Sequence, residues 1–250
     1  MSETTDLKRN ANGIVETVKV VVQALLLALV VRTFFYQPFN IPSGSMKSTL
    51  LVGDYLFVSK FSYGYSQYSI PYAAIPFSGR VFGSEPKRGD VAVFKLPRDN
   101  ETDYIKRVIG LPGDRIQVKR GLLHINGEAV KVEPLEPFSE RGRFGQTKRL
   151  AAFKETLPNG VSHTILRETD EGFQNNTQEY VVPAGHYFMM GDNRDNSQDS
   201  RYLDMVGYVP AENLVGKAQM IFFSIEEGST AWAFWTWPWE IRWSRLANLI

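Results

Sequence analysis

One long apolar run near the start of the chain restricts what this protein can fold into. From Ile14 to Tyr36 the sequence is mostly apolar, and between Val20 and Val31 only Gln23 interrupts it. As an α-helix the run would be about 34 Å long, which is enough to cross a bilayer core of about 30 Å. Lys19 and Arg32 lie near its two ends, where long side chains can reach the headgroups. We therefore predict one N-terminal transmembrane helix at residues 14–36.

A cleavable signal peptide and a buried helix of a soluble protein are the alternatives for this run. A signal peptide should end at a cleavage site of small residues, whereas Arg32 is followed by Thr33 and an aromatic group. That group, Phe34, Phe35 and Tyr36, is typical of a membrane–water interface. A buried soluble helix fits an apolar run of this length less well. The sequence therefore favours an uncleaved anchor.

The charges that flank the run indicate its orientation only weakly. Three basic residues favour a cytoplasmic N-terminus: Lys8, Arg9 and Lys19. Three acidic residues lie among them: Glu3, Asp6 and Glu16. Residues 1–13 are polar and lack periodicity, so we predict a short flexible tail there.

Beyond the apolar run the chain alternates short strand-like segments with turns. Pro38 and Pro42 end any helix, and the later segments place apolar and β-branched residues between turn signals. The predicted strands are 55–60, 91–96, 104–109, 115–118, 122–125, 128–132, 187–190 and 220–225. Asn126-Gly127 is a strong two-residue hairpin turn. We predict a mostly β fold built on an antiparallel β-sheet.

Three less regular segments complete the predicted organisation. Residues 61–85 are rich in Tyr, Ser, Pro and Gly and predict an irregular loop. Residues 133–179 are polar and broken by Pro and Gly, which indicates an insertion. We predict a main β domain at residues 37–114 and 180–228 and a smaller inserted β-rich lobe at residues 115–179. The last segment, residues 229–250, is a tryptophan-rich tail.

The composition excludes several classes of function. The 250 residues include no cysteine, so disulfides, Cys-based zinc sites and a cysteine nucleophile are ruled out. The three histidines, His124, His163 and His186, show no metal-ligand spacing. The formal net charge of +1 implies no general attraction to nucleic acid. We therefore expect no metal, no small-molecule cofactor and no nucleic-acid partner.

A serine stretch directly after the apolar run is the first candidate for chemistry. In Ile41-Pro42-Ser43-Gly44-Ser45-Met46 two serines lie on either side of a glycine. Proline restricts the backbone and glycine permits a tight turn. One hydroxyl could then attack a carbonyl while the other donates a hydrogen bond to the resulting oxyanion. A simple Ser/Gly/Pro loop after a membrane segment explains the same residues, so the stretch alone leaves both interpretations open.

Two later segments, together with this stretch, resemble a known family. They read YIKRVIGLPGD at residues 104–114 and GDNRDNSQDSR at residues 191–201. In this order, the three segments resemble the boxes of type I signal peptidases, the membrane-bound Ser/Lys proteases that remove signal peptides. The resemblance extends from about Val31 to Lys217. Ser48 departs from it, because the family usually has proline there, and this affects the expected turn after the nucleophile.

The resemblance implies that Ser45 is the nucleophile and Lys106 its general base. A serine hydroxyl needs a base to attack an amide, and lysine can serve only when neutral, which burial favours. Strand alternation places Lys106 on one face with Tyr104 and Val108. Without the resemblance, Lys106 and its neighbour Arg107 would be interpreted as surface charges. A Ser-His-Asp triad is not excluded by sequence order, although each histidine is better explained as structural.

The resemblance also assigns supporting roles. Ser43, with the backbone N–H of Ser45, would complete the oxyanion hole, and Ser197 would orient the lysine. Asp199 and Arg201 would form a structural pair, since buried opposite charges must be paired. The alternating Asp and Asn residues of the third segment also suggest a calcium loop, but its arginines and the lack of a closing glutamate argue against this.

Substrate choice is expected to come from small apolar pockets, because signal peptides have small residues at the first and third positions before the cut. Six residues match pocket positions of the family: Phe39, Ile41, Met46, Leu56, Val93 and Ile105. An extended substrate would add as a strand beside Asp103-Tyr104-Ile105.

The anchor and the resemblance together imply a membrane-bound serine endopeptidase that removes signal peptides from exported preproteins at the outer face of the cytoplasmic membrane. Its partners would be preprotein signal peptides and membrane lipid. One alternative is a self-cleaving Ser/Lys repressor-type protease, which would carry a DNA-binding domain in place of the anchor. The other is a membrane-tethered binding or assembly protein with an inactive protease fold, against which the intact Ser45, Lys106 and Ser197 argue.

The tail holds all five tryptophans of the chain: Trp232, Trp235, Trp237, Trp239 and Trp243. Pro238 can begin a helix, which would place four apolar residues on one face: Trp239, Trp243, Leu246 and Ile250. Arg242 and Arg245 would point away from that face. Such a segment is suited to the headgroup region of a membrane. Packing on the β domain or self-association is the alternative.

Overall fold

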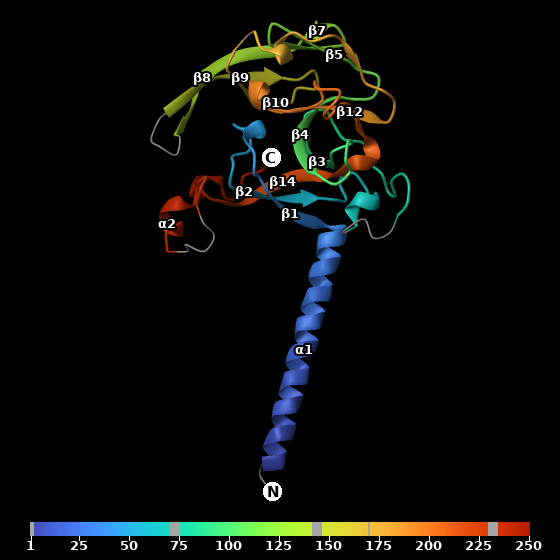
Figure 1. The fold of residues 1–250 in the computed structure, drawn as a ribbon, viewed down its shortest axis with the longest axis vertical. Coiled ribbons are helices and arrows are strands. Elements are labelled where there is room, and N and C mark those ends of the chain that lie inside the picture. Colours follow the sequence, from blue (N-terminus) through green and yellow to red (C-terminus); the bar gives the residue numbers. More distant parts are fainter. Residues whose placement is uncertain (1–2, 71–75, 142–146, 170, 230–234) are drawn as a thin grey trace.

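A single long helix extends from one side of a mostly β domain (Figure 1). The protein is described by a computed structural model that covers residues 3–70, 76–141, 147–169, 171–229 and 235–250. Helix α1 spans Glu3–Phe34. Its part Ile14–Phe34 has a mean hydropathy of 2.3, none of it is buried, and it is long enough to cross a membrane. The prediction of a flexible tail at residues 1–13 is wrong from Glu3 onwards, because α1 already begins there. The helix can extend this far because the sequence has no helix-breaking proline before Pro38.

Seven antiparallel strands form the main sheet, in the order β1-β2-β14-β3-β4-β12-β13. Their bounds are β1 Tyr36–Asn40, β2 Asp54–Ser59, β3 Val91–Lys95, β4 Asp103–Gly110, β12 His186–Met190, β13 Val209–Pro210 and β14 Leu214–Ser224. Register shifts interrupt the pairing of β14 with β2 and with β3, and such bulges bend a strand. The sheet therefore curls, and the predicted mostly β, antiparallel fold is confirmed.

Two smaller sheets lie at the end of the domain that faces away from α1 (Figure 1). One has the order β11-β5-β6-β7 and the other β10-β9-β8. Their bounds are β5 Arg115–Lys119, β6 Leu122–Ile125, β7 Glu128–Ala129, β8 Lys131–Arg141, β9 Thr147–Thr156, β10 Ser162–Arg167 and β11 Tyr180–Val181. The predicted hairpin turn at Asn126-Gly127 joins β6 to β7, with both residues at positive φ. The polar segment 133–179 thus forms strands, including the long β8–β9 pair.

An apolar cluster fixes both ends of the serine stretch. Ile41 and Met46 are buried, and they belong to one cluster with Leu50, Leu56 and residues of the main sheet. The residues between them form a short 3-10 helix, Gly44–Met46. Burial of the flanking side chains therefore holds the serines at the surface of the core.

The tail does not form the predicted helix over residues 238–250. Helix α2 spans only Trp237–Glu240, and a 3-10 turn follows at Trp243–Arg245. The chain instead returns to β14, where Ile241 bridges Ile225 and Leu249 bridges Met220. Arg242 and Arg245 point into the domain toward the buried Asp54. A buried carboxylate needs a cationic partner. The helix propensity of the tail does not compensate for losing the ion pairs between its arginines and Asp54. Trp232 lies outside the described residues.

Candidate active site

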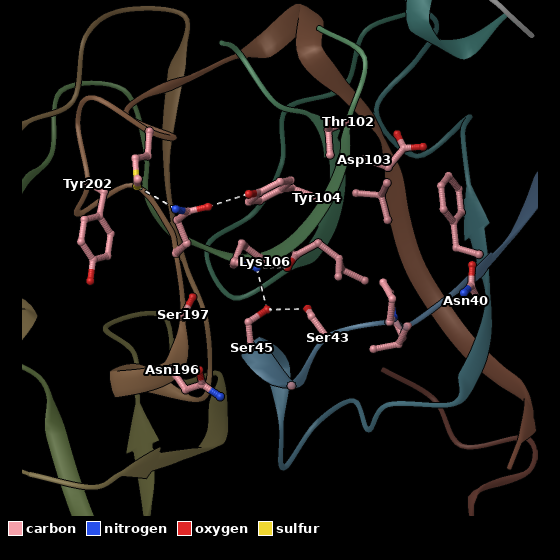
Figure 2. A pocket seen from close by; sticks show the side chains of 18 of the residues that line it. Asn40, Ser43, Ser45, Thr102, Asp103, Tyr104, Lys106, Asn196, Ser197 and Tyr202 are labelled. Carbon is pink, nitrogen blue, oxygen red and sulfur yellow. Dashed lines mark hydrogen bonds between the residues drawn. The ribbon is translucent and has the colours of Figure 1, made fainter. Parts of the chain in front are cut away.

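The two serines of the stretch face the same cavity (Figure 2). Ser43 is extended, with φ −125° and ψ 152°, and precedes the 3-10 helix that carries Ser45. The two hydroxyl oxygens lie 3.3 Å apart. Because Ser45 is in the first turn of a helix, its N–H has no acceptor within that helix. This N–H and the Ser43 hydroxyl form a pair of donors suited to an oxyanion.

Lys106 reaches the same point from strand β4 (Figure 2). Its Nζ donates to Ser45 Oγ at 2.7 Å and to the carbonyl of Ile105 at 2.9 Å. The lysine is 3% exposed, and Nζ lies 5.2 Å from the ring centroid of Tyr104. The predicted shared face of Tyr104 and Lys106 agrees with this contact. Serine and lysine therefore meet in a buried contact.

Burial lowers the pKa of Lys106 from 10.5 to about 8. Asp199 and Asp192 favour the charged form and oppose this shift, while the charge of Arg201 adds to it. At neutral pH a substantial minority of the lysine, about one molecule in ten, is thus the neutral amine that can accept a proton. This fits the requirement for a lysine base.

Ser197 lines the cavity, but the structure gives it no hydrogen bond to Lys106. It is buried against Gly191, where an added Cβ atom would lie 2.2 Å from Ser197 Oγ and 2.6 Å from the Ser45 carbonyl oxygen. Only glycine allows this approach. The predicted role of Ser197 in orienting the lysine stays a prediction.

The predicted pair of Asp199 and Arg201 is present and buried. Arg201 donates through Nε and Nη2 to the two carboxylate oxygens of Asp199, each at 2.8 Å. Asp199 also accepts from the N–H of Gly191 at 2.9 Å. The bidentate contact neutralises the buried carboxylate of Asp199. Together with the bond from the Gly191 N–H, it fixes the backbone at the start of the segment 191–201.

Sequence reasoning missed a second buried pair, Arg107 with Asp192. Arg107 donates to the two oxygens of Asp192 at 2.9 and 2.7 Å. Thr49 joins the pair, donating to Asp192 at 2.5 Å. Next in the chain, Asn193 donates from its N–H to the Ser45 carbonyl at 3.1 Å and from its amide to the Gly44 carbonyl at 3.0 Å. The family-like segments contain three of these residues, but no local signal identified Thr49.

The cavity beside the serines has a volume of about 860 Å³. Five of the seven predicted substrate residues line it: Phe39, Ile41, Val93, Asp103 and Ile105. Met46 and Leu56 are fully buried in the apolar cluster and are not among the lining residues. Their predicted role in substrate binding stays a prediction.

Two strand edges border this cavity. β1 pairs only with β2 among the described strands. β12 pairs with β4 along residues 107–110, so residues 103–106 have no partner strand opposite β3 in the described part of the chain. Unpaired edges can accept an added strand. The cavity can therefore bind an extended peptide through its backbone.

The histidines lie elsewhere, as expected for structural residues. His124 and His186 make contacts with carbonyls two residues earlier in their own strands or turns. His163, on β10, is buried 3.3 Å from Glu155 and 3.8 Å from Asp192. No group of three or more His, Cys, Asp or Glu in the described ranges could hold a metal ion.

Ser48 occupies a backbone conformation that proline cannot adopt. Its φ is 82°, whereas the proline ring holds φ near −65°. Its hydroxyl donates to the carbonyl of Thr164 at 2.8 Å, which ties the turn after the serine stretch to β10. The turn therefore differs from one built around the proline that the family usually has.

A family model and several relatives match most of this chain. The model of the family "Signal peptidase, peptidase S26" matches residues 14–223. Signal peptidase I of Rickettsia typhi (strain ATCC VR-144 / Wilmington) is 46% identical over 208 residues, covering 80% of this chain and 76% of the relative. That of Rickettsia prowazekii (strain Madrid E) is 45% identical over 208 residues, with the same coverage. The crystal structure of a signal peptidase I from Enterococcus faecalis V583 shares 27% identity, covering 54% of this chain and 97% of that chain, with a TM-score of 0.32.

Proposed function

Because this chain belongs to the signal peptidase family, peptidase S26, we propose that it removes signal peptides from exported preproteins with Ser45 as nucleophile and Lys106 as general base. The observation that carries this proposal is the buried 2.7 Å contact between Lys106 Nζ and Ser45 Oγ. A serine beside a lysine of lowered pKa has both elements of an activated nucleophile.

In the proposed reaction, neutral Lys106 takes the proton of Ser45 as Oγ attacks the scissile carbonyl. The Ser45 N–H and the Ser43 hydroxyl donate to the oxyanion. Protonated Lys106 then gives its proton to the leaving amine, and the peptide bond breaks. The same lysine next activates a water molecule, which hydrolyses the acyl-enzyme ester and regenerates Ser45. Every proton passes through Lys106, so a single base serves both halves of the reaction.

The substrate would bind as an extended strand between the free edges of β1 and β4. Backbone hydrogen bonds to such edges are independent of side-chain identity, and pockets select alternate side chains. Phe39, Ile41, Val93 and Ile105 would form the walls that admit only small residues next to the cut. Asp103 would mark the far end of the strand.

The fold fits a single-pass membrane protein. We place the N-terminus in the cytoplasm and the β domain at the outer face, where exported precursors emerge. Trp235, Trp239 and Trp243 are 64%, 80% and 60% exposed. The short helix α2, which carries Trp239, lies at the lower left edge of the domain, in the half from which α1 extends (Figure 1). Trp is enriched at membrane interfaces, so these residues would rest in the headgroups.

The test is cleavage of a preprotein by the detergent-solubilised full chain. Ser45→Ala and Lys106→Ala should each abolish cleavage, and the double variant should be no worse than either single, because residues acting as one unit are non-additive. Ser66→Ala, a buried serine outside the cavity, is the matched control and should cleave normally. Cleavage by Ser45→Ala would exclude the Ser45–Lys106 dyad. So would a double variant whose loss of activity equals the product of the losses in the two single variants.

A further inference from the structure

A buried ion pair lies outside the active-site cavity, at the start of β2. The Asp54 carboxylate is fully buried. Its Oδ1 accepts from Ser224 Oγ at 2.6 Å and from Arg245 Nε at 3.0 Å. Its Oδ2 accepts from the N–H of Leu51 at 2.7 Å and from Arg245 Nη2 at 2.6 Å. This bidentate, charge-assisted geometry is among the strongest that proteins use.

Both arginines near this carboxylate come from the tryptophan-rich tail. Arg245 is 191 residues from Asp54 in the sequence, and Arg242 Nη2 lies 3.7 Å from Asp54 Oδ1. A buried carboxylate that loses its cation is strongly destabilised. The charge of Asp54 therefore holds the tail on the domain, with the side chains of both arginines directed into the domain.

The same arginines bind the backbone of the turn between the serine stretch and β2. Arg245 Nη2 also donates to the Thr49 carbonyl at 2.9 Å, and Arg242 Nη2 donates to the Val52 carbonyl at 2.5 Å. Gly53 completes the turn with φ 90°, and an added Cβ atom there would lie 2.2 Å from the Ile225 carbonyl oxygen. The turn is thus packed directly on β14 and the tail.

This turn is bonded to both ends of the serine stretch. The N–H of Leu50 donates to the Met46 carbonyl at 2.8 Å, and the N–H of Ile41 donates to the Asp54 carbonyl at 2.8 Å. Ile41 and Met46 bracket the two active-site serines. A displacement of the turn would therefore move the backbone that carries both hydroxyls.

Thr49 connects the turn to the strand that carries the base. Its carbonyl accepts from Arg245, while its hydroxyl donates to Asp192 at 2.5 Å and accepts from Arg107 Nη2 at 3.2 Å. Arg107 follows Lys106 in β4. One residue thus links Arg245 to the charged pair beside the base.

We infer that Arg245 is a positioning residue for the proposed reaction: through Asp54 and the Thr49 carbonyl it sets the distance between Ser45 and Lys106. The inference rests on the proposed function. Arg245 lies outside the cavity lining and would act without touching substrate. A misplacement of about 1 Å caused by a distant substitution can cost about 10²-fold in rate, so a small shift of the turn is sufficient.

The test compares Arg245→Lys and Arg245→Met with wild type in the full chain. Lysine keeps the positive charge but lacks the planar guanidinium group, whose several N–H donors bind Asp54 and the Thr49 carbonyl at the same time. We expect kcat to fall at least about tenfold while KM for a preprotein changes little. The rise of kcat/KM with pH should also move to higher pH, because a looser dyad admits water and reduces the desolvation of Lys106. Lys should retain more activity than Met.

Arg88→Lys is the matched control. Arg88 Nη2 pairs with Asp114 at 2.9 Å. The side chains of Arg88 and Asp114 are mostly buried, as is the side chain of Arg245. The pair lies outside the cavity lining, so its loss should lower stability and leave the kcat of the folded fraction unchanged. Folded fractions are measured by chemical denaturation for every variant.

Two results would overturn the inference. One is a folded Arg245→Lys with wild-type kcat and pH profile, and the other is an equal loss of kcat in Arg88→Lys. In either case an inactive Ser45→Ala variant leaves the proposed function intact. An active Ser45→Ala variant would instead remove the proposed function, whatever Arg245 does.

Discussion

Lys106 Nζ and Ser45 Oγ lie 2.7 Å apart although 61 positions separate the two residues in the sequence. The lysine comes from a strand of the main sheet, and the serine comes from a short helix that opens the domain. The contact forms because the curled sheet and its apolar cluster bring both backbones to one edge of the cavity. Its chemistry depends on how strongly burial disfavours the lysine charge.

Cleavage should increase with pH as Lys106 loses its proton. With the pKa lowered to about 8, kcat/KM should rise by about tenfold between pH 7 and pH 9 and then level off. Lys106→Arg should be inactive at every pH, because a guanidinium does not deprotonate in this range. The measurement is a kcat/KM profile from pH 6 to about 10. An active Lys106→Arg variant would exclude Lys106 as the base.

Replacing Lys106 with methionine should stabilise the protein at neutral pH. The folded-state pKa, about 8, is below the usual 10.5, so the folded state binds the proton less tightly than the unfolded state. This penalty is fully present below about pH 8 and disappears as the pH rises to about 10.5. We expect Lys106→Met to raise the free energy of unfolding at pH 7 by up to about 3 kcal/mol, and by less at pH 10.

Chemical denaturation at the two pH values measures this difference. Lys119→Met, at an exposed position of β5, is the control and should change stability little at either pH. An equal gain for Lys106→Met at pH 7 and pH 10 would show that packing, and not the lysine charge, causes the stabilisation.

Ser43→Ala should reduce kcat by roughly 10²–10³ with little change in KM, because it removes one oxyanion donor. The 3.3 Å separation of its hydroxyl from that of Ser45 places the donor beside the attacking atom. Ser43→Thr should retain more activity, since it keeps a hydroxyl. Steady-state kinetics on one preprotein checks both variants, and a Ser43→Ala enzyme as fast as wild type would contradict the oxyanion role.

Gly191→Ala should strongly reduce kcat while leaving the protein folded. The added methyl would lie 2.2 Å from Ser197 Oγ and 2.6 Å from the Ser45 carbonyl oxygen, so the nucleophile backbone has to move, with an expected loss of about 10²-fold in kcat. Gly83→Ala is the control, because the nearest atom to a Cβ there is the Arg80 Cβ at 3.7 Å. Wild-type kcat in Gly191→Ala would show that the site tolerates this shift.

The tryptophans of the tail should lie in the lipid headgroups. All five tryptophans of the chain are in the tail, so tryptophan emission, excited at a wavelength where tyrosine does not absorb, reports on this segment alone. In vesicles made with brominated lipids, we expect quenching to be strongest for bromine close to the headgroup. The double variant Trp239→Phe, Trp243→Phe should lose most of that quenching. Trp237 should contribute little, because its ring packs on that of Phe223, with 5.6 Å between the ring centroids. Unquenched wild-type fluorescence would mean that the tail does not touch lipid.

Local patterns determined the elements of this protein and its candidate chemistry. The apolar run, the strand segments and the Asn126-Gly127 turn follow from the sequence, because hydrophobic periodicity and turn propensity act between near neighbours. The three segments with Ser45, Lys106 and Ser197 identified the site through resemblance to a family. Spacing alone left both the serines and the lysine open to ordinary structural explanations.

Only the tertiary structure decided which side chains meet. It placed Met46 and Leu56 fully inside the apolar cluster, a degree of burial that their match to the pocket positions of a family did not show. It also turned Arg245 inward onto Asp54, against the helix that the tail pattern predicted. Burying the charge of Asp54 makes its pairing mandatory, and its partner Arg245 lies 191 residues away in the sequence, beyond the reach of any local pattern.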